Sequence, residues 1–150
     1  MLQRTRTVIR QQYFALEKGL TIMTGKEKGI VLVVDDESDI IMVLSEFLKN
    51  DGYSAVTARS GIQALGTIRE QRIDLVLLDI SMPIMNGLDT LRELKKFKPE
   101  LPVIMITAYR DAEKVIDAVR LGAFDCVFKP FDLTYLRKTI ASKLSAIKNE

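Results

Sequence analysis

The chain has 150 residues, 47% hydrophobic and 28% charged, a composition typical of a single soluble globular domain. Its 22 basic and 20 acidic residues leave a net charge of +2, so no general affinity for nucleic acids is indicated. The absence of histidine excludes histidine-based catalysis and histidine metal ligands, and the single cysteine, Cys126, excludes an internal disulfide. No apolar run approaches the roughly 18 residues of a membrane span, and no signal-peptide core is present, so we expect a cytoplasmic protein.

Residues 1–28 predict a separate N-terminal extension. This stretch holds six basic and two acidic residues, a net charge of +4, whereas the remaining chain carries −2. Its apolar residues recur at helical spacing, which fits a docking, dimerising or surface-binding helix. A poorly ordered extension, or a biological start at Met23, explains the segment equally well. The helical stripe consists of Ile9, Tyr13, Leu16, Leu20 and Met23.

Residues 29–148 predict one domain in which strands and helices alternate. An apolar, β-branched run predicts a strand over 30–34, a helix follows over 38–50, and a more polar strand, suited to a sheet edge, covers 53–57. A helix capped by Ser60 comes next, then a strand over 74–79 and a helix that starts near Leu88 and ends near Lys98. The remaining elements are a strand over 102–106, a helix over 115–121, a strand over 124–128 and a helix capped by Asp132.

Five strands that alternate with five helices predict an α/β fold, a doubly wound parallel sheet with helices on both faces. The alternation alone does not determine the order of the strands. Polar residues stand at the ends of four strands: Asp35 and Asp36, Asp79, Thr107, and Lys129. Because the carboxyl ends of parallel strands share one edge of the sheet, we expect these five side chains to lie close together.

This set of side chains suits phosphoryl transfer. Three neighbouring carboxylates repel one another unless a cation lies among them, and Mg²⁺ prefers such oxygen ligands. An unprotonated aspartate can act as a nucleophile and form an aspartyl phosphate, while Lys129 supplies positive charge to the phosphoryl oxygens. Thr107 could donate a hydrogen bond to the phosphoryl group and shift the loop beside it.

Each of these residues also has a purely structural interpretation. Asp35 and Asp36 could cap the following helix, and Thr107 could cap a helix over 108–121. Lys129, which precedes a proline, could be a solvated loop residue. The joint occurrence of all of them at strand ends favours a functional site.

The chain resembles the receiver domain of bacterial two-component response regulators from about Gly29 to Ile147, about four-fifths of its length. The matching motifs are Val-Val-Asp-Asp-Glu at 33–37, Leu-Leu-Asp-Ile-Ser-Met-Pro-Ile-Met-Asn-Gly at 77–87, Ile-Thr-Ala at 106–108, Gly-Ala-Phe-Asp at 122–125 and Phe-Lys-Pro-Phe at 128–131. Details of the last two motifs are closest to receivers of nitrogen-regulation-type transcriptional activators.

The resemblance implies the flavodoxin-like strand order 2-1-3-4-5 and phosphorylation of Asp79 by a histidine kinase or phosphotransfer protein. It implies that Mg²⁺ is held by Asp36 directly, by Asp35 through water, by Asp79 and by the backbone carbonyl of Ser81. Lys129 would contact the phosphoryl group, and its bond to Pro130 is typically cis in the family. Thr107 would be the switch hydroxyl, with the small Ala108 leaving room for the phosphoryl group.

The chain departs from the family at Cys126. Family members usually carry Tyr or Phe there, as a rotating partner of the switch hydroxyl. A thiol cannot swing as a ring does, so the phosphorylation chemistry is expected but the usual aromatic readout is not. We interpret Cys126 as a small buried apolar residue, and note that Tyr109 could fill part of the space.

These observations predict a stand-alone receiver without an output domain, since the last helix runs to the C-terminus. It would be a phosphoacceptor with slow autodephosphorylation rather than a conventional enzyme. It would bind no nucleic acid or membrane directly, with partner or homodimer surfaces near 111–121 and 132–147.

Two other classes of function remain open. One is an interaction module that works without phosphorylation. The other is an Asp-nucleophile phosphatase, although such enzymes commonly carry a second acid where Ser81 stands. A flavin or nucleotide module is disfavoured because no glycine-rich loop follows the first strand.

Overall fold

The computed structural model describes residues 28–148. The helical stripe predicted within residues 1–28 therefore lies outside the described part of the chain. The elements are β1 (Ile30–Val34), α2 (Ser38–Asn50), β2 (Ser54–Ala58), α3 (Gly61–Glu70), β3 (Leu75–Asp79), α4 (Gly87–Phe97), β4 (Val103–Thr107), a 3₁₀ turn (Tyr109–Asp111), α5 (Lys114–Arg120), β5 (Asp125–Phe128) and α6 (Leu133–Lys148).

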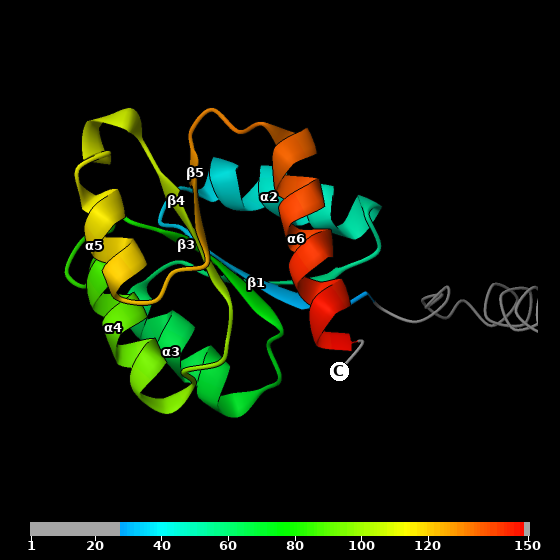
Figure 1. Cartoon of the computed structure of the whole chain (residues 1–150), viewed down its shortest axis with the longest axis horizontal. Helices are drawn as coiled ribbons and strands as arrows, with labels where there is room; N and C mark the ends of the chain where they lie inside the picture. Colours follow the sequence, from blue (N-terminus) through cyan, green and yellow to red (C-terminus); the bar gives the residue numbers. More distant parts are fainter. Residues whose placement is uncertain (1–27, 149–150) are drawn as a thin grey trace, which may run out of the picture.

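All strands run parallel in one sheet of order β2-β1-β3-β4-β5. Helices α2 and α6 cover one face, and α3, α4 and α5 cover the other (Figure 1). The doubly wound fold and its strand order are thus confirmed, as is the prediction that the polar second strand lies at an edge. Among the described helices, none has the length and apolarity needed to cross a bilayer.

The strand that ends in Asp79 is buried along its whole length. Successive side chains point to opposite faces, so Val76 and Leu78 join the core beneath α3, α4 and α5. Leu75 and Leu77 join the core beneath α2 and α6. Since both faces are covered by helices, the strand is continuously apolar rather than alternating, and its only carboxylate stands at its end.

Local side-chain contacts set the helix boundaries. Ser60 Oγ accepts a hydrogen bond from the Gln63 amide at 3.1 Å, and Asp132 Oδ1 accepts one from the Tyr135 amide at 3.0 Å, so both predicted caps are confirmed. Asn86 caps α4 in the same way, through the Asp89 amide at 2.9 Å. The left-handed φ of +92° at Gly52 ends the turn after α2.

The segment after β4 differs most from the prediction. Strand β4 includes Thr107, one residue beyond the expected end, and a 3₁₀ turn precedes α5. The helix predicted over 115–121 begins at Lys114 and ends at Arg120. This turn sits beside the sheet edge where the candidate residues gather.

Candidate functional site

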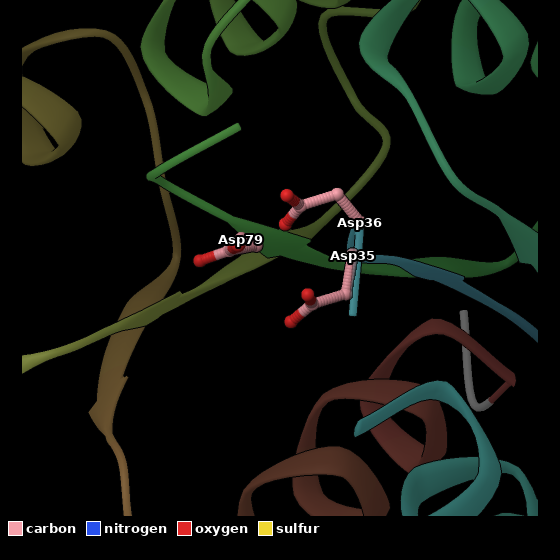
Figure 2. Close-up of side chains that lie close together, drawn as sticks. All are labelled: Asp35, Asp36 and Asp79. Carbon is pink, nitrogen blue, oxygen red and sulfur yellow. The ribbon is translucent and has the colours of Figure 1, made fainter. Parts of the chain in front are cut away.

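The three carboxylates predicted at strand ends lie together. Asp35 and Asp36 follow β1, and Asp79 is the last residue of β3. Because Val34 is paired with Leu78 in the parallel sheet, the residues that follow them emerge side by side. One carboxylate oxygen from each aspartate lies within 4.8 Å of the others (Figure 2). Asp35 is fully buried and Asp79 is 3% exposed, so water screens this negative charge poorly.

Lys129 reaches the carboxylates from the end of β5. Its Nζ donates a hydrogen bond to Asp35 Oδ2 at 3.1 Å and forms an ion pair with Asp79 Oδ1 at 3.7 Å. Its backbone N–H donates to the Thr107 carbonyl at 2.8 Å, which ties the segment to the neighbouring strand. The Lys129–Pro130 peptide bond is cis, as the resemblance implies. The interpretation of Lys129 as a solvated loop residue is therefore wrong.

Burial and mutual repulsion shift the acidity of this cluster. Burial, followed by repulsion from Asp35, raises the pKa of Asp79 to about 6, although Lys129 opposes the rise. Burial also raises the pKa of Asp35, against the hydrogen bond from Glu37 and the charge of Lys129. For Lys129, burial favours the neutral amine, but attraction to Asp79 and Asp35 outweighs it and the pKa is raised. The Lys129 side chain therefore remains a charged ammonium, and its single positive charge does not balance the negative charges of the neighbouring carboxylates.

The loop after Asp79 folds back against the site. The Ser81 N–H donates to Asp79 Oδ1 at 3.3 Å, and the Gly87 N–H donates to the Ile80 carbonyl at 2.8 Å. A Cβ at position 87 would lie 2.1 Å from the Asp79 carbonyl oxygen, so only glycine fits where α4 begins. The Ser81 N–H thus holds one oxygen of the Asp79 carboxylate, while Gly87 allows α4 to begin against the Asp79 backbone.

Thr107 is buried beside the cluster. Ile106 is the partner of Asp79 in the sheet, so Thr107 stands one residue beyond Asp79 along the adjacent strand. Its Oγ1 donates to the Ala108 carbonyl at 3.2 Å. The hydroxyl lies at the edge where the resemblance requires it, hydrogen-bonded within its own segment.

The capping interpretations of these residues are wrong. Glu37 occupies the N-cap of α2 and no side chain caps that helix, while Asp35 Oδ1 accepts the Glu37 N–H at 2.9 Å ahead of the first turn. Ala108 precedes the 3₁₀ turn, and no side chain caps it, so Thr107 is not a cap either. Asp35 and Thr107 therefore make local hydrogen bonds without serving as helix caps.

Sequence reasoning missed Arg59. This residue follows β2, and its Nη2 donates to the Asp36 backbone carbonyl at 3.0 Å. The same strand-end rule that found the other residues, applied to the second strand, would have identified it. Arg59 holds the backbone of Asp36 from the end of β2.

Cys126, interpreted from the sequence as a small buried apolar residue, is half-buried and packs as an apolar residue. Cys126 packs against the core beneath α3, α4 and α5, and burial, followed by the charge of Asp125, raises the pKa of its thiol and so favours the protonated form. Tyr109 stacks on Phe128, two residues beyond Cys126 along β5, with ring centroids 4.7 Å apart and planes 5° apart.

The carboxylate cluster fits a hard divalent cation. All of its candidate ligand atoms are carboxylate oxygens, which Mg²⁺ prefers, and a cation among them would relieve the repulsion that raises the pKa of Asp79. The ammonium of Lys129 neutralises the cluster only in part.

Comparison with known proteins identifies the same region. The family described as "Response regulator receiver domain" matches residues 31–141. The transcriptional regulatory protein ZraR of Klebsiella oxytoca is 40% identical over 103 residues, which cover 69% of this chain but 23% of that protein. This chain therefore spans about a quarter of the length of such relatives. Sporulation initiation phosphotransferase F of Bacillus subtilis is 34% identical, with 72% of this chain and 87% of that protein covered.

Solved structures give the same result. A response regulator receiver domain protein from Clostridium thermocellum superposes with a TM-score of 0.76 at 35% identity, covering 80% of this chain and 97% of that one. The receiver domain of NtrX from Brucella abortus superposes with a TM-score of 0.73 at 38% identity, covering 77% and 98%. Fold, sequence motifs and relatives agree, and the chain belongs to the response regulator receiver domain family of two-component signalling.

Proposed function

We propose that this receiver domain accepts a phosphoryl group on Asp79 from a histidine kinase or phosphotransfer protein and thereby changes its binding to a partner. The observation that carries the proposal is the contact of Lys129 with both Asp35 and Asp79 beside Asp36. A purely structural role would not explain two buried carboxylates and a third acid around one ammonium, because burial without full neutralisation costs free energy.

The transfer step follows from the position of Asp79. One Oδ of Asp79 attacks the phosphorus of a phosphohistidine, the P–N bond breaks, the imidazole leaves with that electron pair, and an acyl phosphate forms. The Lys129 ammonium neutralises charge on the phosphoryl oxygens, and the Thr107 hydroxyl donates a hydrogen bond to one of them. The Ser81 N–H donates a hydrogen bond to Asp79 Oδ1, and this bond holds the carboxylate so that Oδ2 can attack.

Asp35, Asp36, Asp79 and the Ser81 backbone carbonyl are the residues that we propose to hold Mg²⁺. The ion, when bound, neutralises the phosphoryl oxygens and the carboxylates around it. Asp36 is the more accessible of the first two acids, while Asp35 is fully buried and shared with Lys129. Arg59, which binds the Asp36 carbonyl, positions that residue.

Partner surfaces are proposed on α5 and α6. Exposed apolar side chains support this: Ile116 and Val119 on α5 are 61% and 58% exposed, and Tyr135 on α6 is 47% exposed. Burying these apolar side chains against a partner removes them from water, which favours binding. A homodimer through this region remains part of the proposal.

Mass spectrometry after incubation with Mg²⁺ and acetyl phosphate tests the function. We expect the wild type to gain about 80 Da, the mass of one HPO₃, and Asp79→Asn to gain nothing. The control Asp117→Asn removes an exposed acid on α5 and should gain the same mass as the wild type. Retention of the adduct by Asp79→Asn, or its absence from the wild type, would contradict the proposal.

The two alternative functions predict different outcomes. A phosphatase would turn over a phosphate ester repeatedly. Such enzymes carry a second acid two residues after the nucleophile, but here that residue is Ser81, whose backbone N–H contacts Asp79. An interaction module that needs no phosphorylation would bind its partner equally well as Asp79→Asn. A Mg²⁺ titration that leaves tyrosine fluorescence unchanged would favour that module.

A further inference from the structure

A pair of stacked aromatic rings stands at the edge of the site where the usual switch ring is missing. Tyr109 opens the 3₁₀ turn after β4, and Phe128 is the last residue of β5. Their rings are nearly parallel, with centroids 4.7 Å apart. Phe128 is paired in the sheet with Thr107, so the stack adjoins the two strand ends that carry the switch hydroxyl and the lysine.

Tyr109 is connected to Thr107 through one carbonyl group. The Ala108 carbonyl accepts the Thr107 hydroxyl at 3.2 Å and also the Asp111 N–H at 2.9 Å. The second of these bonds closes the turn that carries Tyr109. A Thr107 hydroxyl that turned to a phosphoryl oxygen would give up the first bond and leave the turn with one fewer constraint.

Phe128 is connected to Lys129 by the chain itself. The Lys129 ammonium contacts Asp35 and Asp79, and its N–H bonds the Thr107 carbonyl. A displacement of the Lys129 backbone toward a phosphoryl group would therefore be passed to Phe128 through one peptide unit. Each ring of the stack is therefore connected to a residue that would contact the phosphoryl group, Tyr109 to Thr107 and Phe128 to Lys129.

The stack also lies on the face of the sheet where a ring at position 126 would stand. Side chains two residues apart on a strand share a face, so Phe128 shares the face of Cys126, the face toward α3, α4 and α5. The intervening Val127 belongs to the opposite core. Phe128 lies two residues nearer than Cys126 to the carboxyl end of β5, where the site is.

We propose that the Tyr109–Phe128 stack replaces the missing ring at position 126 and converts phosphorylation of Asp79 into a change at the surface. This inference rests on the proposed function. When the phosphoryl group draws in Thr107 and Lys129, the 3₁₀ turn moves relative to the end of β5 and the ring geometry changes. Tyr109 is 72% exposed, so the change is presented directly to a partner.

Fluorine NMR of the full chain labelled with 3-fluorotyrosine tests this proposal. The protein has four tyrosines, so the Tyr109 resonance is assigned by its loss in Tyr109→Phe. On addition of Mg²⁺ and acetyl phosphate, we expect the Tyr109 resonance to shift more than that of Tyr53, which is buried in the core beneath α2 and α6. In Phe128→Leu most of that shift should be lost, because the ring that Tyr109 reports on is gone.

The matched control is Phe124→Leu. Phe124 precedes the same strand and stands under Lys143, whose Nζ is 4.6 Å from its ring centroid, away from the stack. This variant should keep the full Tyr109 shift. Mass spectrometry on each sample shows whether Asp79 carries the phosphoryl group.

The possible outcomes separate the two proposals. If the mass increases but the Tyr109 resonance does not move, or if Phe128→Leu keeps the full shift, the stack is not the readout and only this inference fails. If neither the mass nor the resonance changes in the wild type, the proposed function fails together with it. Where Phe128→Leu does not fold, Phe128→Met takes its place with the same loss of shift expected, and an unmoved Tyr109 resonance in the phosphorylated wild type overturns the inference in either case.

Discussion

Asp79 is held in a setting that favours its protonated form when no cation is bound. Its folded pKa is about 6 and its ordinary value is 3.8, so the folded state binds the proton more tightly than the unfolded state. The stabilising contribution of this group is therefore fully present below about pH 4 and is lost as the pH rises through 6. At neutral pH the nucleophile is ionised at a cost in stability.

Asp79→Asn should consequently stabilise the metal-free protein at pH 7. The expected gain in free energy of unfolding is on the order of 2 kcal/mol, and it should shrink toward zero near pH 4, where wild-type Asp79 is protonated in both states. Urea denaturation in EDTA at several pH values measures it. Asp117→Asn, a surface control, should change stability by less than about 0.5 kcal/mol. A destabilised Asp79→Asn at pH 7 would show that the carboxylate is already neutralised in the wild type.

Ile84 is held in an unfavourable backbone conformation at the surface. Its φ is +68° and its side chain is 99% exposed. A β-branched residue in the left-handed region is sterically strained, and because the Ile84 side chain is exposed, no burial offsets that strain.

Ile84→Asn should therefore raise the free energy of unfolding by about 1 kcal/mol, because Asn tolerates positive φ. Thermal and urea unfolding measure the change. Ile62→Asn is the matched control, since Ile62 is similarly exposed, at 66%, but lies within α3. It should give no gain. Equal gains in both variants would mean that lost surface hydrophobicity, rather than backbone conformation, is responsible.

At the scale of elements, the loop between β3 and α4 depends on close approach of two backbones. Gly87→Ala would place a Cβ 2.1 Å from the Asp79 carbonyl oxygen, and neither backbone can yield without moving the site. We expect a loss of about 2–3 kcal/mol in stability and slower phosphorylation by acetyl phosphate.

Gly66→Ala provides the control for the same substitution. Nothing lies within 4 Å of a Cβ at Gly66, which is inside α3, so alanine should stabilise that helix by about 0.5–1 kcal/mol. Urea denaturation of both variants gives the comparison. Tolerance of alanine at position 87 would show that the α4 start is free to shift.

Much of this arrangement could be predicted from the sequence because it follows from periodicity and parallel topology. The alternation of elements, the buried strand before Asp79 and the gathering of strand-end residues need only the rule that parallel strands share a carboxyl edge. Details that depend on loop backbone could not be predicted. The stacking of Tyr109 on Phe128 and the left-handed φ of Ile84 depend on dihedral angles that residue types alone do not determine.

For the molecule as a whole, Mg²⁺ should act as a stabilising ligand. A ligand that binds only the folded state adds RT ln(1 + [L]/Kd), about 2.7 kcal/mol at a hundredfold excess over Kd. We expect Mg²⁺ to raise the unfolding temperature reversibly, with EDTA removing the effect. The gain should be larger at pH 7 than at pH 5, because protons compete for Asp79 at the lower pH.

Asp36→Asn should weaken this stabilisation, since it removes one of the proposed ligands, while Asp117→Asn should retain it. Differential scanning fluorimetry across Mg²⁺ concentrations measures both. Full Mg²⁺ stabilisation of Asp36→Asn would place the ion elsewhere.

The contact between Lys129 and Asp35 joins residues 94 positions apart in the sequence. During synthesis, all three acids leave the ribosome well before the lysine that helps to neutralise them. A nascent chain that ends before β5 therefore has the carboxylates of the site without the ammonium that forms ion pairs with Asp35 and Asp79. The edge strand β5 and the ammonium of the site are therefore added in the same stretch of synthesis, so a chain cut short before β5 lacks both the fifth strand and the partial neutralisation that Lys129 gives the acids.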